Sequence, residues 1–157
     1  MSAKYATFDF AVLKIQQTPN RFLMLPLELK SRSRADIPSP VIAKSASDAA
    51  RIWFQVLSEE QQVYLKRYDL INLQFDFIQR TGIFHFIDDI TVQFFDRNHA
   101  SSTLAVYSRS KVGIYDFGVN RRRVTRWVTL MQQAVKQLTS LDNLPHIAEW
   151  VNLFPRA

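Results

Sequence analysis

An alternation of apolar and polar residues in the middle of the chain restricts the fold more than any other feature. Between residues 71 and 77, and again between residues 84 and 94 after a bend at Thr81-Gly82, most alternate positions are apolar. This period is typical of strands that have one buried face. The sequence therefore predicts two antiparallel strands whose buried face carries Ile71, Leu73, Phe75, Phe77, Phe84, Phe86, Ile90, Val92 and Phe94.

A third strand is predicted over Thr103–Ser110, after a polar turn at residues 96–101. With this turn position the apolar residues of the second and third strands face each other, and a shift of one residue would break that match. Asp88 falls on the apolar face, whereas its neighbour Asp89 points to the opposite face. The predicted cross-strand pairs are Phe94–Leu104, Val92–Val106, Ile90–Ser108, Asp89–Arg109 and Asp88–Ser110.

Two longer stretches have the helical period. The first is predicted to run from Ser47, its N-cap, to Glu60, and the second from Arg121 to Leu138 with Asn120 as N-cap. Their apolar stripes comprise Ala50, Trp53, Phe54 and Leu57 in the first and Val124, Trp127, Val128, Met131, Val135 and Leu138 in the second. Because sheet and helices both need cover for their apolar sides, the sequence predicts an α+β fold. Its small, twisted, mainly antiparallel sheet has the two main helices packed on one face.

The length of 157 residues fits a single domain over residues 1–157, with no visible repeat or second core. Residues 4–17 are predicted to form a short helix or strand, and Pro26 argues against a central strand over residues 23–29. Residues 141–157 form a C-terminal extension. Its apolar residues are expected to pack on the body of the domain. The oligomeric state is not predicted.

The composition excludes several kinds of site. The chain has no cysteine, so disulfides and thiolate metal sites are excluded, and His85, His99 and His146 lack the spacing of metal ligands. No cofactor motif is present. The first residues lack the apolar core of a signal peptide, and no apolar run reaches the roughly 20 residues of a membrane span. We therefore expect a basic, cytoplasmic protein without a metal or cofactor.

Most of the excess positive charge lies between Ser108 and Trp127. This stretch contains six basic residues and one acid, Asp116, so it carries +5 of the chain's formal net charge of +6. It also holds Gly113 and Gly118, which permit tight turns between the third strand and the second helix. A helix N-terminus favours an anion, and arginine side chains can add paired donors beside it.

The same stretch carries the pattern S-R-S-x-x-G-x-x-D-x-G-x-N-x-x-R, preceded in the chain by Arg80 and Asp88. The pattern is met by Ser108, Arg109, Ser110, Gly113, Asp116, Gly118, Asn120 and Arg123. In this the chain resembles domain-of-unknown-function family 1499, a set of uncharacterised, mostly bacterial proteins, over residues 18–131. Many relatives have cysteines near the Pro-Asn step at residues 19–20, and this chain has none. The resemblance implies a fold unit and a site, with no established reaction.

Two interpretations of the motif are open, and both can hold together. In the first, Arg109, Asn120, Arg121 and Arg123 bind an anionic or amphipathic small ligand, and the apolar sheet and helix supply the rest of the pocket. In the second, acids inside the fold neutralise the arginines. Removal of Arg109 would then strongly destabilise the fold, because a carboxylate would lose its partner. The network of this second interpretation comprises Arg80, Asp88, Asp89, Ser108, Ser110, Gly113, Asp116 and Gly118.

Two further functions are alternatives. The helix start at Arg121–Arg126, with Lys30, Arg32 and Arg34, could contact nucleic-acid phosphates, although no nucleic-acid-binding motif is recognisable. Asp88 on the apolar face could act as an acid or base, but no nucleophile–base pair accompanies it, so no catalytic residue is predicted. The favoured prediction is a non-enzymatic binding domain for an anionic or amphipathic small ligand or a protein partner.

Overall fold

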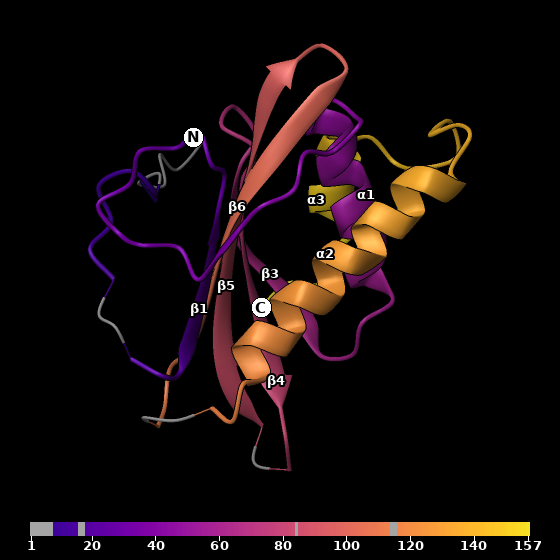
Figure 1. Ribbon diagram of the computed structural model, residues 1–157. Coiled ribbons are helices and arrows are strands. Elements are labelled where there is room, and N and C mark those ends of the chain that lie inside the picture. Colours follow the sequence, from indigo (N-terminus) through magenta and orange to yellow (C-terminus); the bar gives the residue numbers. More distant parts are fainter. Residues whose placement is uncertain (1–7, 16–17, 84, 114–115) are drawn as a thin grey trace.

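The computed structural model describes residues 8–15, 18–83, 85–113 and 116–157, which form an α+β fold (Figure 1). Its six-stranded sheet has the order β2-β1-β6-β5-β4-β3, and every neighbouring pair is antiparallel except β1–β2. The strands are β1 (Arg21–Leu25), β2 (Ile37–Pro38), β3 (Val63–Asp69), β4 (Gln74–Thr81), β5 (Phe86–Asn98) and β6 (Ser101–Ser110), and the helices are α1 (Ala46–Ser58), α2 (Val119–Gln137) and α3 (Ile147–Leu153).

The predicted register between the second and third strands is confirmed in the β5–β6 hairpin. All five predicted pairs are present: Phe94–Leu104, Val92–Val106, Ile90–Ser108, Asp89–Arg109 and Asp88–Ser110. Asp88 is 2% exposed, as its place on the apolar face predicts. Phe86, in contrast, begins β5 and is 49% exposed, and Phe84 lies outside the described residues.

The strand predicted over residues 71–77 is displaced. Ile71 is 94% exposed, because it lies in the turn between β3 and β4. The Asp69 carboxylate holds this turn by accepting hydrogen bonds from the backbone N–H groups of Ile71 and Asn72, at 3.0 and 3.1 Å. The predicted strand over residues 71–77 thus combines a turn at residues 70–73 with the start of β4. A separate strand, β3, precedes the turn and was not predicted.

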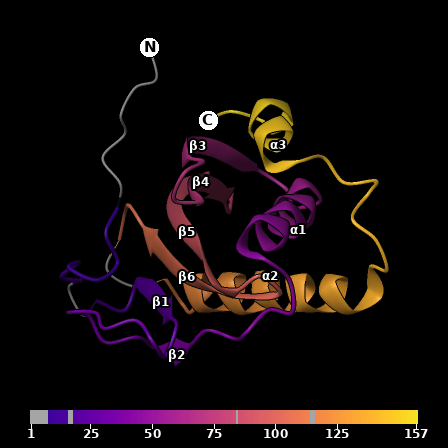
Figure 2. The ribbon, with the colours of Figure 1, turned by 90° about the horizontal axis from the view of Figure 1, so that it is seen from above.

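The two main helices pack on one face of the sheet, as predicted, and α3 joins them there (Figure 2). Aromatic rings connect the layers. The Trp53 ring of α1 meets the Trp127 ring of α2 edge-on at 5.9 Å between centroids. Phe54 meets Phe75 and Phe77 of β4 at 5.0 and 5.3 Å. These rings are almost fully buried, so the predicted helical stripes face the core.

The C-terminal extension packs on the body of the domain, as expected. Trp150, Val151 and Phe154 are buried, and the Phe154 ring lies 5.4 Å from that of Phe54 and 5.5 Å from that of Phe77. The extension therefore completes the core instead of leaving its apolar side exposed.

Both predicted N-caps are wrong. Helix α1 begins at Ala46 because the Ser45 hydroxyl, and not that of Ser47, accepts the Asp48 N–H at 3.2 Å. Helix α2 begins at Val119 after Gly118, whose φ of 78° is in the left-handed region that favours glycine. Asn120 thus lies inside the helix, where its side chain is free to turn toward the sheet.

The opposite face of the sheet is covered by residues 8–15 and the 26–36 loop, drawn in indigo and purple in Figure 1. Residues 8–15 form neither helix nor strand, and residues 4–7 and 16–17 lie outside the described part of the chain. Pro26 argues against a central strand over residues 23–29. This prediction is wrong for Leu23 and Leu25, because they belong to β1, which pairs with both β2 and β6. The proline lies directly after the strand. Among the described residues, no helix is long and apolar enough to cross a membrane.

Candidate functional site

Strand β6 divides the motif between the two faces of the sheet. Ser108 is fully buried on the helix side, whereas the guanidinium of its neighbour Arg109 lies over the ring of Phe8 on the opposite side. This separation follows from the two-residue period of a strand. The motif therefore builds two separate environments.

The centre of the helix-side environment is an ion pair between Arg123 of α2 and Asp88 of β5. Their side chains are 3% and 4% exposed, and the Nη2–Oδ2 distance is 2.5 Å. Arg123 Nε donates to Gln79 Oε1 at 2.6 Å, and Nη1 donates to Ser108 Oγ and Asn120 Oδ1 at 3.0 and 2.8 Å. All three nitrogens of the guanidinium thus have partners inside the fold, which a buried charge requires.

Asn120 extends this network to the loop between β6 and α2. Its Nδ2 donates to Asp116 Oδ2, Ser110 Oγ and the Asn20 carbonyl, at 2.6, 3.0 and 3.0 Å. The Asp116 carboxylate also accepts the backbone N–H groups of Gly118 and Asn120, at 2.8 and 3.1 Å. A carboxylate of the chain itself therefore occupies the helix start at which an external anion was expected.

The four residues expected to bind a ligand do not converge. Asn120 and Arg123 are in the buried network, and Arg109 lies across the sheet. Arg121 is exposed on α2, and its guanidinium lies 4.8 Å from the centroid of the Phe22 ring. Residues two apart on a helix project in nearly opposite directions, which separates Arg121 from Arg123.

Arg109 is half-buried and is held by neutral groups. Its Nη1 donates to Thr91 Oγ1 at 3.1 Å and to the Tyr107 carbonyl at 3.2 Å. Its guanidinium also lies 4.5 Å from the centroid of the Tyr107 ring and 5.6 Å from that of Phe8. Burial lowers the pKa of Arg109, and the charge of Asp89 opposes that effect.

Asp89 is opposite Arg109 in the register, but its closest ion pairs are with lysines. The distances from its carboxylate to Lys66 and Lys111 Nζ are 3.5 and 3.7 Å. Arg80 is exposed and lies over the Tyr64 ring at 5.6 Å. The outer members of the predicted network thus belong to a more solvated environment than Asp88 and Arg123.

Sequence reasoning did not single out two members of the helix-side network, Gln79 and Asn20. Gln79 has the same parity as Phe75 and Phe77 along β4. A polar residue at such a position, on the apolar face of a strand, could have indicated a member of a buried network. Asn20 contributes through its carbonyl, and its side chain donates to the Gly113 carbonyl at 2.7 Å. A backbone contact of this kind leaves no mark in the sequence.

A hollow of about 310 Å³ lies beside the first turns of α2. Arg122 and Arg126 are exposed at its edge, one helical turn apart. Arg126 pairs with Glu60 at 2.5 Å, and Arg122 Nη1 donates to the Phe117 carbonyl at 2.7 Å. The lining residues are Glu60, Gln79, Thr81, Val119, Arg122, Arg123, Arg126 and Trp127. Because Arg123 is already paired with Asp88, the charge of the α2 hollow comes from the two exposed arginines and one acid, which leave it net positive.

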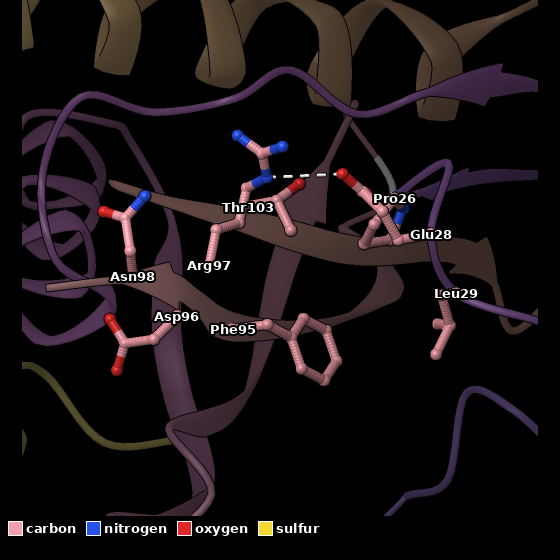
Figure 3. A pocket seen from close by; sticks show the side chains of 8 residues that line it. All are labelled: Pro26, Glu28, Leu29, Phe95, Asp96, Arg97, Asn98 and Thr103. Atoms are coloured by element: carbon pink, nitrogen blue, oxygen red, sulfur yellow. Dashed lines mark ion pairs between the residues drawn. The ribbon is translucent and has the colours of Figure 1, made fainter. Parts of the chain in front are cut away.

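A larger pocket of about 460 Å³ lies near the opposite end of β5 (Figure 3). Arg97 Nε and Glu28 Oε1 form an ion pair there at 3.2 Å, and the Asp96 carboxylate accepts the Ala46 N–H at 2.7 Å. Two acids against one arginine make its lining net negative, so the smaller α2 hollow is the better anion site. The described residues contain no group of three or more histidine, aspartate or glutamate side chains that could hold a metal ion.

Comparison with curated proteins and with solved structures finds no significant match. Comparison with protein-family models finds one that covers residues 12–131, a longer stretch than the resemblance over residues 18–131. The family is described as "Protein of unknown function (DUF1499)", and the buried network lies entirely within the matched residues. The chain belongs to this family.

Proposed function

We propose that the domain is a non-enzymatic binding module that takes up a small amphipathic molecule with an anionic group in the α2 hollow. The observation that carries the proposal is the pair of exposed arginines in the lining, Arg122 and Arg126, against the single acid Glu60. Val119 and Trp127 supply apolar surface beside those charges. A pocket with apolar walls and a few charged groups is suited to a ligand with both characters.

Arg122 and Arg126 are the expected ligand contacts. Both guanidinium groups are exposed, and Arg122 is held by a neutral carbonyl, so it can accept an anion without losing a carboxylate partner. Arg126 would exchange Glu60 for the ligand or share it. Both side chains are long and can turn toward a ligand at small cost.

The proposal gives Asn120 and Arg123 a positioning role. Through Asp88, Ser108 and Gln79 they fix the start of α2 against β4, β5 and β6, which sets the place of Arg122 and Arg126 on the helix surface. Arg109 and Arg121 belong to other surfaces and are not expected to touch the ligand.

The two alternatives have less support. For nucleic acid, Arg121, Arg123 and Arg126 do not form one row, because Arg123 is buried and Arg121 lies over Phe22. For catalysis, Asp88 does not line the α2 hollow, and its carboxylate is paired with Arg123. A binding module requires neither a row of arginines nor a free carboxylate in the hollow.

Isothermal titration calorimetry with inorganic phosphate and with octyl phosphate tests the proposal. Octyl phosphate should bind more tightly, and the Arg122→Ala/Arg126→Ala variant should bind it roughly tenfold more weakly or worse, since two charge-assisted contacts are lost. The matched control is Lys136→Ala, an exposed cation in the last turn of α2, which should leave the affinity unchanged. Equal affinities for all three proteins would overturn the proposal.

A further inference from the structure

One end of the domain exposes apolar side chains on two loops. Ile83 is 90% exposed in the turn between β4 and β5, and Phe86 is 49% exposed where β5 begins. Val112 and Phe117, in the loop between β6 and α2, are 66% and 77% exposed. Both loops are at the lower end of Figure 1. We call these four side chains the apolar tips.

The two loops are neighbours in space. Strands β5 and β6 pair up to Asp88 and Ser110, and beyond this pair the Lys111 N–H donates to the Ile87 carbonyl at 3.3 Å. Val112 therefore emerges close to the start of β5 and to the turn that carries Ile83. The apolar tips therefore belong to two loops at the same end of the sheet.

The backbone keeps this end in a conformation that is costly for ordinary residues. Phe117 has a φ of 54°, in the left-handed region that side chains with a Cβ disfavour, and it remains 77% exposed. The bonds of Asp116 to Gly118 and Asn120, and that of Asn20 to the Gly113 carbonyl, hold the loop on both sides of Phe117. The loop therefore holds Phe117 in place with most of its surface exposed.

Cations accompany the apolar tips. Lys111 is exposed and precedes Val112, and Arg80 is exposed three residues before Ile83. The guanidinium of Arg122 donates to the carbonyl of Phe117. Apolar side chains with lysine and arginine directly behind them match an anionic bilayer surface. The tips enter the boundary of the acyl chains, and the cations remain among the headgroups.

From this arrangement we infer that the end formed by the β4–β5 turn and the β6–α2 loop docks on the surface of an anionic lipid bilayer. Separate exposed tips on two loops suit a deformable lipid surface better than a rigid protein surface, which requires matched contours. The inference does not depend on ligand binding in the α2 hollow. It assigns the glycines and Asp116 of the motif the task of presenting Val112 and Phe117.

Co-sedimentation of the full chain with vesicles tests the inference. The chain should bind vesicles of mixed phosphatidylcholine and phosphatidylserine, and should bind pure phosphatidylcholine far more weakly. The Ile83→Ser/Val112→Ser/Phe117→Asn variant should bind the mixed vesicles roughly tenfold more weakly or worse, because three apolar side chains no longer enter the lipid. Asparagine at position 117 tolerates the left-handed backbone, which protects the fold.

Two comparisons make the test specific. The Leu27→Ser/Leu153→Ser variant removes side chains that are 83% and 66% exposed elsewhere, and it should bind like the unchanged protein. The Lys111→Gln/Arg80→Gln variant should lose affinity for mixed vesicles only, by roughly fivefold per charge. Circular dichroism and the melting temperature verify folding. Should the triple variant unfold, Ile83→Ser alone replaces it, with a smaller loss expected.

Failure of the unchanged protein to bind mixed vesicles would overturn the inference. So would equal losses in the tip variant and in the Leu27/Leu153 control, because binding would then be non-specific. A third outcome would also overturn the inference. If the chain does not bind vesicles but forms a dimer in sedimentation, and the tip variant abolishes that dimer, this end is an interface with a second copy.

Discussion

Arg123 and Arg109 belong to one motif, but they lie on opposite faces of the sheet and are neutralised in different ways. Arg123 is buried against the carboxylate of Asp88, whereas Arg109 lies near two aromatic rings and donates to a hydroxyl and a carbonyl. The neighbouring acids show the same division, since Asp88 is buried and Asp89 meets two partly exposed lysines. The face on which a charged residue lies, and not its place in the motif, decides how strongly the fold depends on it.

The largest effect is expected on the buried face. Asp88→Ala leaves the Arg123 guanidinium buried without a counter-charge, so it should lower the free energy of unfolding by about 3–5 kcal/mol. Urea denaturation followed by circular dichroism measures this loss. The control is Asp142→Ala, an exposed acid outside the network, which should change stability little. A loss below about 1 kcal/mol for Asp88→Ala would mean that the two faces do not differ as proposed.

The next effect tests how far the buried network reaches. Asp116→Ala removes the acceptor of the Gly118 and Asn120 N–H groups and of the Asn120 amide. Loss of such a helix-start acceptor should destabilise the fold by about 1–2 kcal/mol. In hydrogen exchange, amides in the first turn of α2 should lose protection before those near Met131. Uniform loss of protection along α2 would contradict a local role.

Much of the fold could be predicted, because the alternation of apolar residues determines both the register of paired strands and the face on which each side chain lies. The five β5–β6 pairs followed from aligning Phe94 with Leu104, and the buried position of Asp88 followed from the same parity. The helix ends were not readable, because Ser45 and Ser47 are equally good caps in sequence. Tertiary contacts alone select between them.

The sequence predicted which residues belong to the site better than it predicted how they are arranged. The pattern brought together Ser108, Ser110, Asp116, Asn120 and Arg123, which do share one hydrogen-bond network. It could not show that Asn120 turns inward, since that depends on a helix that begins two residues earlier than expected. The helical period places Arg122 and Arg126 away from the apolar stripe, but it could not show that they lie over a hollow, which depends on the distance between α2 and the end of α1.

A smaller effect is expected for Arg109, although the sequence suggested a large one. Arg109→Ala does not leave Asp89 alone, because Lys66 and Lys111 remain beside that carboxylate. The loss should be about 1–2 kcal/mol, from the packing on Tyr107 and Phe8 and from one hydrogen bond to Thr91. Arg109→Met should recover part of it, since methionine keeps apolar contact with both rings. A loss as large as that of Asp88→Ala would show that Arg109 carries an essential charge.

The smallest effect is expected for Asp89. This residue gives the most direct comparison of the two faces, because it is next to Asp88 in the sequence but points to the opposite face. Asp89→Ala adjoins Asp88→Ala in sequence but removes ion pairs with lysines whose side chains are 36% and 44% exposed, together with a longer-range attraction to Arg109. Such pairs contribute about 0.2–1 kcal/mol. They weaken as salt screens them, so the difference in stability from the unchanged protein should shrink between low and high salt. The Asp88→Ala loss should persist in the same salt series, because its buried partner is screened far less. If both losses fell with salt to the same degree, Asp88 and Arg123 would have to be accessible to solvent in solution.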